Sequence, residues 1–516
     1  MSKASLPLCW SLRRRQAAQA AGLLVTLAFG CGAPEGDPSP PPPSGEVTPP
    51  GAVEATPPPG FIAASPQRPG DAKKGYDTLV NFGYVRCGVP YSLFAAYSLL
   101  FPTKEADKLP GRTGHNAQLP YYLSAFTNKQ GVELVSPNCM VCHVSRMGGK
   151  LVVGLGETNS DYTSGLTSFG DLLSKLLSLG IGLKPAEKAE LDRFLARSQA
   201  VGEFLVTRTR GTNPADNLGA VLAAHRDPVT LGWSDKPRME LPDKEPVPFD
   251  VPPWWRVRKK NALYYLGFGQ GDHSRLMMAA SMLCTDSTAE ADEIDARFPD
   301  VRAYLAELGA PSYPFAIDKA LADSGRGVFE RTCSRCHGTY APAVAGPSGA
   351  LLRDRDQDRY PNRLIDIDEV RTDPMPIEEI ETPRGRSYTA WLNESWFGKV
   401  SRIKPGHGYV APPLDGIWAT APFLHNGSVP TLEALLDSSK RPRYFTRRFV
   451  PDDFDPVAVG VRVTPLDHGQ LDEKDPQKRA ALYDTTLRGY SNRGHTFGDA
   501  LGADERKAVL EYLKTL

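Results

Sequence analysis

The chain has 516 residues, and 60 Lys and Arg side chains balance 60 Asp and Glu side chains, so its formal net charge is zero. This balance excludes the global basic surface that binds nucleic acid. The hydrophobic fraction of 41% is that of a folded protein, and the length predicts two or three domains.

Residues 1–31 have the features of an export signal. A basic segment with Arg13–Arg15 precedes the apolar run "AAQAAGLLVTLAFG" (17–30), which is too short to cross a bilayer as a mature helix. The ending "LAFGC" (27–31) resembles the lipobox of bacterial lipoproteins, in which the cysteine, here Cys31, carries a lipid, although the leucine stands one place early. Cleavage nearby without a lipid is the alternative. We expect an exported protein, in the periplasm or at the outer membrane or cell surface, anchored to the membrane as a lipoprotein.

Residues 32–70 form a Pro-rich linker. The segment holds almost no apolar bulk, so it cannot close a core of its own. Its prolines predict a semi-rigid, extended spacer between the anchor and the folded body.

Two C-x-x-C-H motifs carry the strongest chemical signal, "CMVCH" (139–143) and "CSRCHG" (333–338). On a helix, cysteines three apart share a face, so both thiols reach the two vinyl groups of one porphyrin, and the next residue becomes the proximal iron ligand. A redox dithiol needs a βαβ context, and a zinc site needs two closely spaced pairs; neither is present. We therefore expect two covalently bound haem c groups. Their predicted binding residues are Cys139, Cys142 and His143, and Cys333, Cys336 and His337.

Two further cysteines, Cys87 and Cys284, stand outside these motifs. An oxidising compartment permits a disulfide between them. The sequence does not place them near each other, so two separate buried thiols remain the alternative.

The first haem domain is expected over residues 71–312. Its apolar residues recur every three or four positions in 165–183 and in 186–205, which predicts helices. Strand signals are few and short, and "KLVVGLG" (150–156) is the best of them. No nucleotide-binding glycine loop occurs in a suitable context.

The second haem domain is expected over residues 313–516. A short helix within 324–338 runs into the second motif, and residues 501–516 show helical spacing of apolar residues. An N-terminal helix that ends in C-x-x-C-H and is crossed by a C-terminal helix resembles the cytochrome c fold. The expected fold class is mainly α, with two cytochrome c-like haem domains, long loops and few short strands.

The stretch "VAPPLDGIWATAPFLHNGSVPTLEALL" (410–436) resembles the second-domain loop of the bacterial di-haem cytochrome c peroxidase superfamily, and the likeness continues through 483–516. Together with residues 251–278, the wording is closest to the di-haem rubber oxygenases and fatty-acid dioxygenases. The resemblance implies that one haem exchanges electrons while the other binds peroxide or dioxygen. Some relatives hold calcium between the domains, for which no ligands are assigned here.

The resemblance also suggests the distal ligand of the second haem. Gapless alignment places His407 where the peroxidases have a methionine, which predicts a bis-histidine iron and makes His337 and His407 metal ligands. Met375 is the rival ligand, and an ordinary loop histidine is the alternative for His407. His425 either orients a haem propionate or edge, or packs its own loop.

The first haem, proximal to His143, has no clear sixth ligand in the sequence. His273 is the best candidate to line its distal pocket, with Phe268 and Gln270 as neighbours. The segment lacks the acid with which peroxidase relatives handle peroxide protons, so an apolar pocket suited to dioxygen and an apolar substrate is expected. Met277 and Met278 are assigned to the core.

Trp254 and Trp255 follow two prolines, in the part of the chain where the family places a tryptophan. One of them is the candidate for an aromatic between the haems, and core packing is the alternative. The basic run "RVRKKN" (256–261) either holds haem propionates or forms a solvated face.

These observations predict an exported di-haem oxidoreductase. Its expected partners are dioxygen or hydrogen peroxide, an apolar unsaturated substrate, and a cytochrome or other electron donor. A tethered electron carrier without substrate is the alternative from another class, and a haem-based sensor is a third. An iron with an open coordination position distinguishes catalysis from pure electron transfer.

Overall fold

The computed structural model describes residues 60–516, apart from 101, 166–181 and 346–350. The predicted export signal with Cys31, most of the Pro-rich linker and most of the predicted helix over 165–183 lie outside the described residues. Pro57–Leu516 form one structural unit. The division of this unit into two haem domains at 312/313 stays a prediction.

Helices dominate the described chain, and its strands are short. About 39% of the residues are helical and 13% are in strands, as expected for a mainly α fold. No helix in the described ranges is long and apolar enough to cross a membrane.

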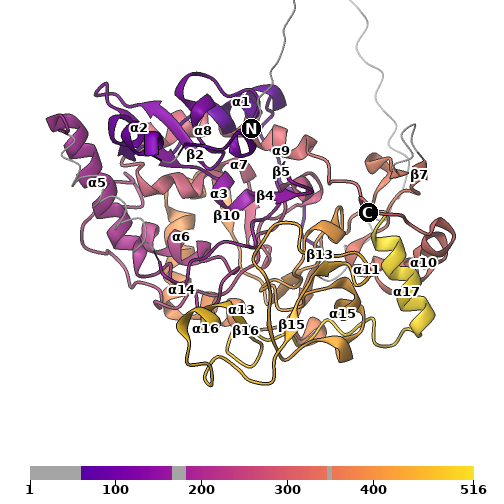
Figure 1. The fold of residues 1–516 in the computed structure, drawn as a ribbon. Coiled ribbons are helices and arrows are strands. Elements are labelled where there is room, and N and C mark those ends of the chain that lie inside the picture. Colours follow the sequence, from indigo (N-terminus) through magenta and orange to yellow (C-terminus); the bar gives the residue numbers. More distant parts are fainter. Residues whose placement is uncertain (1–59, 101, 166–181, 346–350) are drawn as a thin grey trace, which may run out of the picture. The chain divides into compact units, whose positions relative to one another are not determined.

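Figure 1 shows helices joined by long loops. The α-helices before residue 312 are α1 (Ala72–Asn81), α2 (Tyr91–Leu100), α3 (Met140–His143), α5 (Pro185–Gly202), α6 (Ala215–Ala224), α7 (His273–Met277), α8 (Thr288–Asp295) and α9 (Phe298–Glu307). Those after it are α10 (Lys319–Thr332), α11 (Ser334–His337), α12 (Ile367–Val370), α13 (Met375–Glu381), α14 (Pro383–Glu394), α15 (Leu432–Leu436), α16 (Pro476–Ala481) and α17 (Ala503–Leu513). Two 3₁₀ helices matter below, η3 (Trp254–Lys259) and η6 (Trp396–Lys399).

The strands pair antiparallel in small sheets of two or three. The three-stranded sheets join β1 (Val89–Pro90), β3 (Glu133–Pro137) and β2 (Leu123–Thr127), and β15 (Thr464–Pro465), β12 (Tyr444–Thr446) and β16 (Leu482–Asp484). The two-stranded ones pair β4 (Val144–Met147) with β5 (Lys150–Val153), β6 (Gly269–Gly271) with β10 (Ser401–Ile403), β7 (Val344–Ala345) with β8 (Leu351–Leu352), β9 (Leu364–Asp366) with β11 (Gly408–Val410), and β13 (Phe454–Asp455) with β14 (Gly460–Val461).

The helix that leads into the second motif is crossed by the C-terminal helix, as predicted. Gly325 of α10 packs so closely on α17 that an added Cβ would lie 1.9 Å from the carbonyl oxygen of Ala508. The rings of Phe329 and Tyr512 lie 5.2 Å apart across the same contact, and both helices are seen side by side in Figure 1. Glycine is required here because any side chain would separate the helices.

One hydrophobic cluster crosses the predicted domain boundary. It contains Met140 and Val144 at the first motif and residues of α1, α6 and α9, together with Trp391 and Trp396 from far beyond residue 312. The second cluster belongs to α10, α15 and α17.

The last residues of the predicted linker are part of the folded body. Arg68 forms ion pairs of 2.7 Å with Asp272 and 2.6 Å with Asp295, and the Ile62 amide donates to the Asn362 carbonyl at 2.9 Å. The spacer is therefore shorter than residues 32–70, because its end carries an apolar residue and a cation that find buried partners.

Cys87 and Cys284 form a disulfide, with Cα atoms 5.5 Å apart. Both are fully buried beside Phe194. Of the two possibilities that the sequence left open, a disulfide or two separate thiols, the structure shows the disulfide.

A buried square of charges ties η3 to the chain that follows residue 312. Lys259 contacts Asp358 at 2.6 Å and Asp415 at 2.7 Å, and Arg353 contacts the same two carboxylates at 2.8 Å. All four side chains are less than a tenth exposed. Desolvation raises the pKa of Asp415, but Lys259 and Arg353 outweigh it and hold that pKa below its ordinary value.

Asp415→Asn should destabilise the fold by about 3–5 kcal/mol, because it leaves two buried cations with a single carboxylate. Urea unfolding followed by circular dichroism measures the change. Asp323→Asn, which removes an exposed ion pair with Lys319 on α10, is the matched control and should cost at most about 1 kcal/mol. Equal effects of the two variants would contradict a structural role for the square.

Candidate haem sites

Both C-x-x-C-H motifs fold into a single helical turn. The His143 amide donates to the Cys139 carbonyl at 3.2 Å, and the His337 amide donates to the Cys333 carbonyl at 3.0 Å. Each turn places its two thiols on one helix face, as a porphyrin requires.

The four motif cysteines are free thiols. Burial raises the pKa of Cys139 to about 11 and that of Cys333 to about 12.

His337 is oriented as an axial ligand. Its Nδ1 lies 2.9 Å from the carbonyl oxygen of Pro412. That carbonyl can only accept, so Nδ1 carries the proton and Nε2 keeps its lone pair for a metal.

His495 faces His337, and the sequence analysis missed it. The two ring centroids lie 6.1 Å apart. Two imidazoles that share one iron through nitrogens at about 2 Å each have their ring centres about 6 Å apart. Burial lowers the pKa of His495 to about 3, so the ring is neutral, which is the form that binds metal. Its Nδ1 is buried without a hydrogen-bond partner.

The backbone at His495 is strained. Its φ of 46° is in the left-handed region, and Gly494 before it has φ of 75°. An added Cβ on Gly494 would lie 2.2 Å from the backbone of Arg371. Such strain is typical of functional positions, and here it accompanies a ring directed toward His337.

His407 and Met375 do not share this position. The His407 side chain is 57% exposed, and its Nδ1 lies 3.1 Å from Glu381, whose hydrogen bond raises its pKa. Met375 is buried against Gly489, where an added Cβ would lie 2.4 Å from its sulfur. The geometry favours His495 over both as the second axial ligand.

His425 lies in a buried aromatic cluster. Its ring stacks on Tyr409 at 4.4 Å, and its Nε2 lies 3.3 Å from the Tyr409 hydroxyl. Burial lowers its pKa to about 3. Its carbonyl accepts from the Asp250 amide at 2.7 Å, so these contacts match the packing alternative for His425.

The first motif lies beside η3. The His143 ring stacks on Trp254 with centroids 4.7 Å apart, and burial lowers its pKa to about 4. Its Nδ1 is buried without a regular hydrogen bond, although the Pro252 carbonyl acts on the ring and raises the pKa. The amide of Asn213 donates to the Cys142 sulfur at 3.2 Å. Buried thiols beside a neutral imidazole fit a covalently attached haem.

The two neighbouring tryptophans connect both halves of the chain. Trp254 contacts His143, whereas Trp255 is 1% exposed and donates through Nε1 to the Asp415 carbonyl at 2.8 Å. Arg256 is also buried and donates to the same carbonyl at 3.1 Å. The start of the basic run is therefore not a solvated face, and η3 connects the first motif to Asp415.

Two of the three distal candidates are bonded to nearby backbone. The Nε2 of His273 lies 3.3 Å from the Asn261 carbonyl, and Gln270 donates to the Gly267 carbonyl at 3.4 Å. Phe268 instead stacks on Tyr264 at 4.7 Å. Met278 is buried in the core and Met277 packs against it, as expected.

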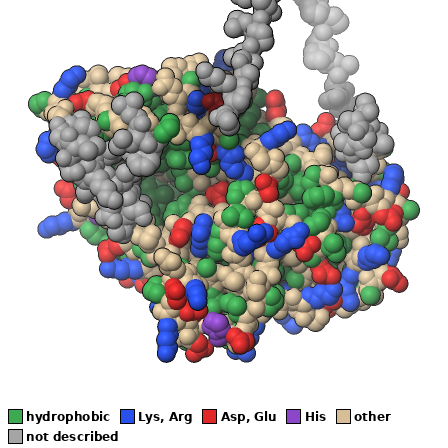
Figure 2. Space-filling model, in the orientation of Figure 1, with side chains coloured by type: hydrophobic (Ala, Val, Ile, Leu, Met, Phe, Trp, Pro, Cys, Tyr) green, Lys and Arg blue, Asp and Glu red, His purple; other side chains and the backbone are tan. Residues whose placement is uncertain are grey.

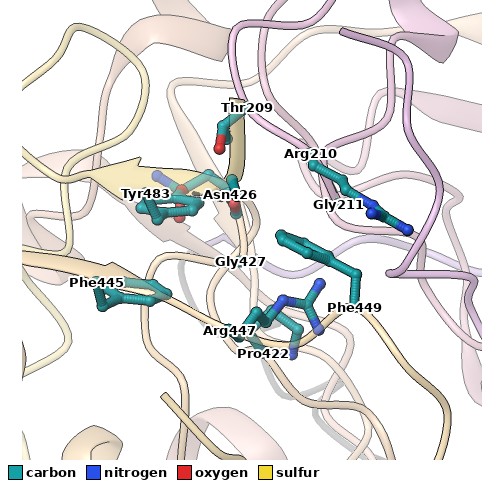
Figure 3. Close-up of a pocket in the computed structure, with 11 residues that line it drawn as sticks. Thr209, Arg210, Gly211, Pro422, Asn426, Gly427, Phe445, Arg447, Phe449 and Tyr483 are labelled. Carbon is teal, nitrogen blue, oxygen red and sulfur yellow. Dashed lines mark hydrogen bonds between the residues drawn. The ribbon is translucent and has the colours of Figure 1, made fainter. Parts of the chain in front are cut away.

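A small pocket lies away from both motifs (Figure 3). Arg210 and Arg447 each lie 4.6 Å from the Phe449 ring. Both guanidinium groups also donate to backbone carbonyls, those of Asn159 and Thr158. None of the motif residues lines the pocket.

Over the described ranges, no three His, Cys, Asp or Glu side chains form a metal-binding group. A haem iron takes at most two protein ligands, so this finding is compatible with both motifs. In that part of the chain, no set of ligands is found for the expected calcium ion.

Comparison with known proteins gives a partial match. Residues 408–446 match the family model described as RoxA-like, cytochrome c-like. Uncharacterized protein y4iM of Sinorhizobium fredii (strain NBRC 101917 / NGR234) is 27% identical over 302 residues, which cover 52% of this chain and 64% of that protein. Uncharacterized protein y4iJ of the same strain is 36% identical over 156 residues, covering 28% and 22%. The matches span less than two thirds of either relative. The family match indicates, in outline, a haem-dependent oxidoreductase.

Asp250 should make stability depend on pH. Burial raises its pKa to about 7, against a hydrogen bond from Tyr265 that lowers it. The folded state then holds a proton that the unfolded state has released, so stability falls between about pH 4 and pH 7, by roughly 4 kcal/mol in total. Urea unfolding across this range should show that Asp250→Asn removes most of the fall. A variant with the wild-type pH profile would contradict the raised pKa.

Proposed function

We propose that the protein is an exported di-haem c-type oxidoreductase with one open and one closed iron. His143 would be the proximal ligand of the first haem. His337 and His495 would hold the second from both sides, in place of the His337 and His407 pair expected from the alignment. The RoxA-like match over residues 408–446 supports the haem oxidoreductase class.

The distribution of all nine histidines carries this proposal. Six of them make other contacts: His115 with Glu133, His225 with the Ser234 carbonyl, His273 with the Asn261 carbonyl, His407 with Glu381, His425 with Tyr409 and His468 with Asp467. A contact at one ring nitrogen leaves the other nitrogen free for iron, so the second site is decided by the facing rings of His337 and His495. Among the ring contacts of the described residues, His143 faces Trp254 and no second histidine, so we assign the first iron a single histidine.

When bound, haem supplies redox chemistry and a position for dioxygen or peroxide. The chain's own residues set the environment. Trp254 covers the proximal imidazole of His143, and Trp255 and Arg256 link this site to Asp415. We assign η3 to the electron path between the two haems. A pure electron carrier, which has no substrate, would need a second axial ligand at the first iron. The contacts of the described histidines favour no such ligand.

The motifs in residues 251–278 and 410–436 favour the oxygenase-like branch, with an apolar unsaturated substrate. The signal features of residues 1–31 support export and a lipid anchor, and a cytochrome is the proposed electron donor. These assignments rest on sequence, and the reaction is tested directly below.

The purified protein should carry two haem groups per chain by mass, and the reduced form should bind one carbon monoxide per chain. His495→Ala should raise this stoichiometry to two, because it opens the second iron. His407→Ala, the matched control, should leave it at one. Two bound ligands in the wild type, or a change in the His407 variant alone, would contradict the assigned axial pair.

Addition of polyisoprene or an unsaturated lipid should cause oxygen uptake without added peroxide. An oxygen electrode measures the rate, with heat-unfolded protein as the control. Peroxide turnover with a reduced cytochrome, in the absence of oxygen uptake, would assign the protein to the peroxidase-like branch instead.

A further inference from the structure

Three polar side chains from separate elements converge near the first motif. They are Asp216 on α6, Tyr264 on the loop before β6 and Tyr388 on α14. Desolvation raises the pKa of Tyr264 to about 12 and that of Tyr388 further, and in both the nearby Asp216 contributes to the rise. Gly219, one turn after Asp216, would carry a Cβ only 3.0 Å from the Tyr388 hydroxyl.

These three groups share a space without bonding to one another. Within the described chain, no hydrogen bond or ion pair engages the Asp216 carboxyl or either hydroxyl. Asp216 is exposed and Tyr264 is 37% exposed, yet desolvation raises the pKa of Asp216 to about 7. Figure 2 shows hydrophobic side chains gathered in a recessed area where Figure 1 labels α6.

Tyr264 is held in this recess by strained backbone. Its φ is 68°, which is rare for a bulky residue. The amide of Leu263 donates to the Gly269 carbonyl at 2.8 Å and closes the loop, and the Tyr264 ring stacks on Phe268. Strain of this kind persists where a side chain must be presented in one direction.

The recess lies close to the first motif. The side-chain amide nitrogen of Asn213 donates to the Cys142 sulfur at 3.2 Å, and its side-chain Oδ1 accepts from the amide of Ala215, the first residue of α6, at 2.9 Å. Asp216 is the next residue, so it lies within about 11 Å of Asn213 along the chain. Phe268 and Tyr388 pack against the same hydrophobic cluster as Met140 of the motif.

We propose that Asp216, Tyr264 and Tyr388 bind the polar end of an uncharged apolar molecule, a long-chain alcohol or carbonyl compound, and disfavour a carboxylate. The hydroxyl groups donate to the ligand oxygen, and Asp216 accepts from an alcohol. A fatty acid would place its charge against Asp216, and like charges in a recess with apolar walls repel strongly. Few polar groups on apolar walls are typical of small-molecule sites. The role of this ligand as a substrate rests on the proposed function; its binding does not.

Isothermal titration of the haem-loaded protein with decanol and with decanoate at about pH 8.5, where Asp216 is ionised and both tyrosines keep their protons, tests the site. Decanol should bind about tenfold more tightly than decanoate. Asp216→Asn should strengthen decanoate binding about tenfold, and Tyr388→Phe should weaken decanol binding about fivefold through loss of one hydrogen bond. Asp192→Asn, which removes an exposed partner of Lys188 on α5, should change neither affinity.

An unchanged preference in Asp216→Asn, or no binding of decanol to the wild type, would overturn the site. Folding is checked by the haem spectrum, and if Asp216→Asn fails to fold, the double variant Tyr264→Phe/Tyr388→Phe decides. Retained decanol affinity in that variant would also overturn the site. Carbon monoxide binding to the same samples reports on the first iron separately. If the wild-type protein binds decanol but no carbon monoxide, the proposed function is refuted and the site remains.

Discussion

The buried square of Lys259, Arg353, Asp358 and Asp415 joins η3, which contacts the first motif, to the half of the chain that carries the second motif. Its two positive and two negative charges balance, and each carboxylate contacts both cations. Each buried charge therefore has partners that offset its cost of desolvation. Because Lys259 ends η3, the square also fixes Trp254 against His143, while the Asp415 carbonyl receives Trp255 and Arg256. A single short helix thereby connects His143 of the first motif to Asp415, which lies within the family-like stretch 410–436.

The contacts around the two motifs differ. In the second site a proline carbonyl fixes the tautomer of His337, and a strained loop presents His495 on the other side. In the first site the His143 ring faces Trp254, and the Nε2 of His273, the distal candidate from the sequence, lies 3.3 Å from the Asn261 carbonyl. Under the proposed function, closed and open coordination would therefore follow from local loop geometry rather than from the motifs, which have the same C-x-x-C-H pattern at both sites.

Several features were predictable because they depend on local spacing. The helical turns of both motifs follow from residues close in sequence. The crossing of α10 by α17 was instead expected from the resemblance to the cytochrome c fold, because these two helices lie far apart in the chain. His407 was chosen by alignment without a gap, which ignores that its loop turns outward to Glu381. His495 carried only a weak signal, a histidine after glycine in a family-like stretch, and its position opposite His337 depends on a positive φ. Asp216 gave no signal, because its environment is created by α14 and the strained Tyr264 loop, both distant in sequence. The ion pairs of Arg68 with Asp272 and Asp295 were likewise not predictable, because Arg68 lies in a Pro-rich segment.

An open iron is useful only if its substrate is held nearby and its electrons are resupplied. η3 lies on one side of the first motif and connects it to the second half, whereas Asn213, two residues before α6, contacts the Cys142 sulfur. Electron supply and substrate binding would then use different neighbours of one motif. Such a separation lets the substrate recess change its polarity, through residues such as Asp216 and Tyr388, without disturbing the buried charges that position the electron path. On this argument, relatives with the same motifs and the same η3 contacts would differ in substrate mainly by what stands at the N-terminal end of α6.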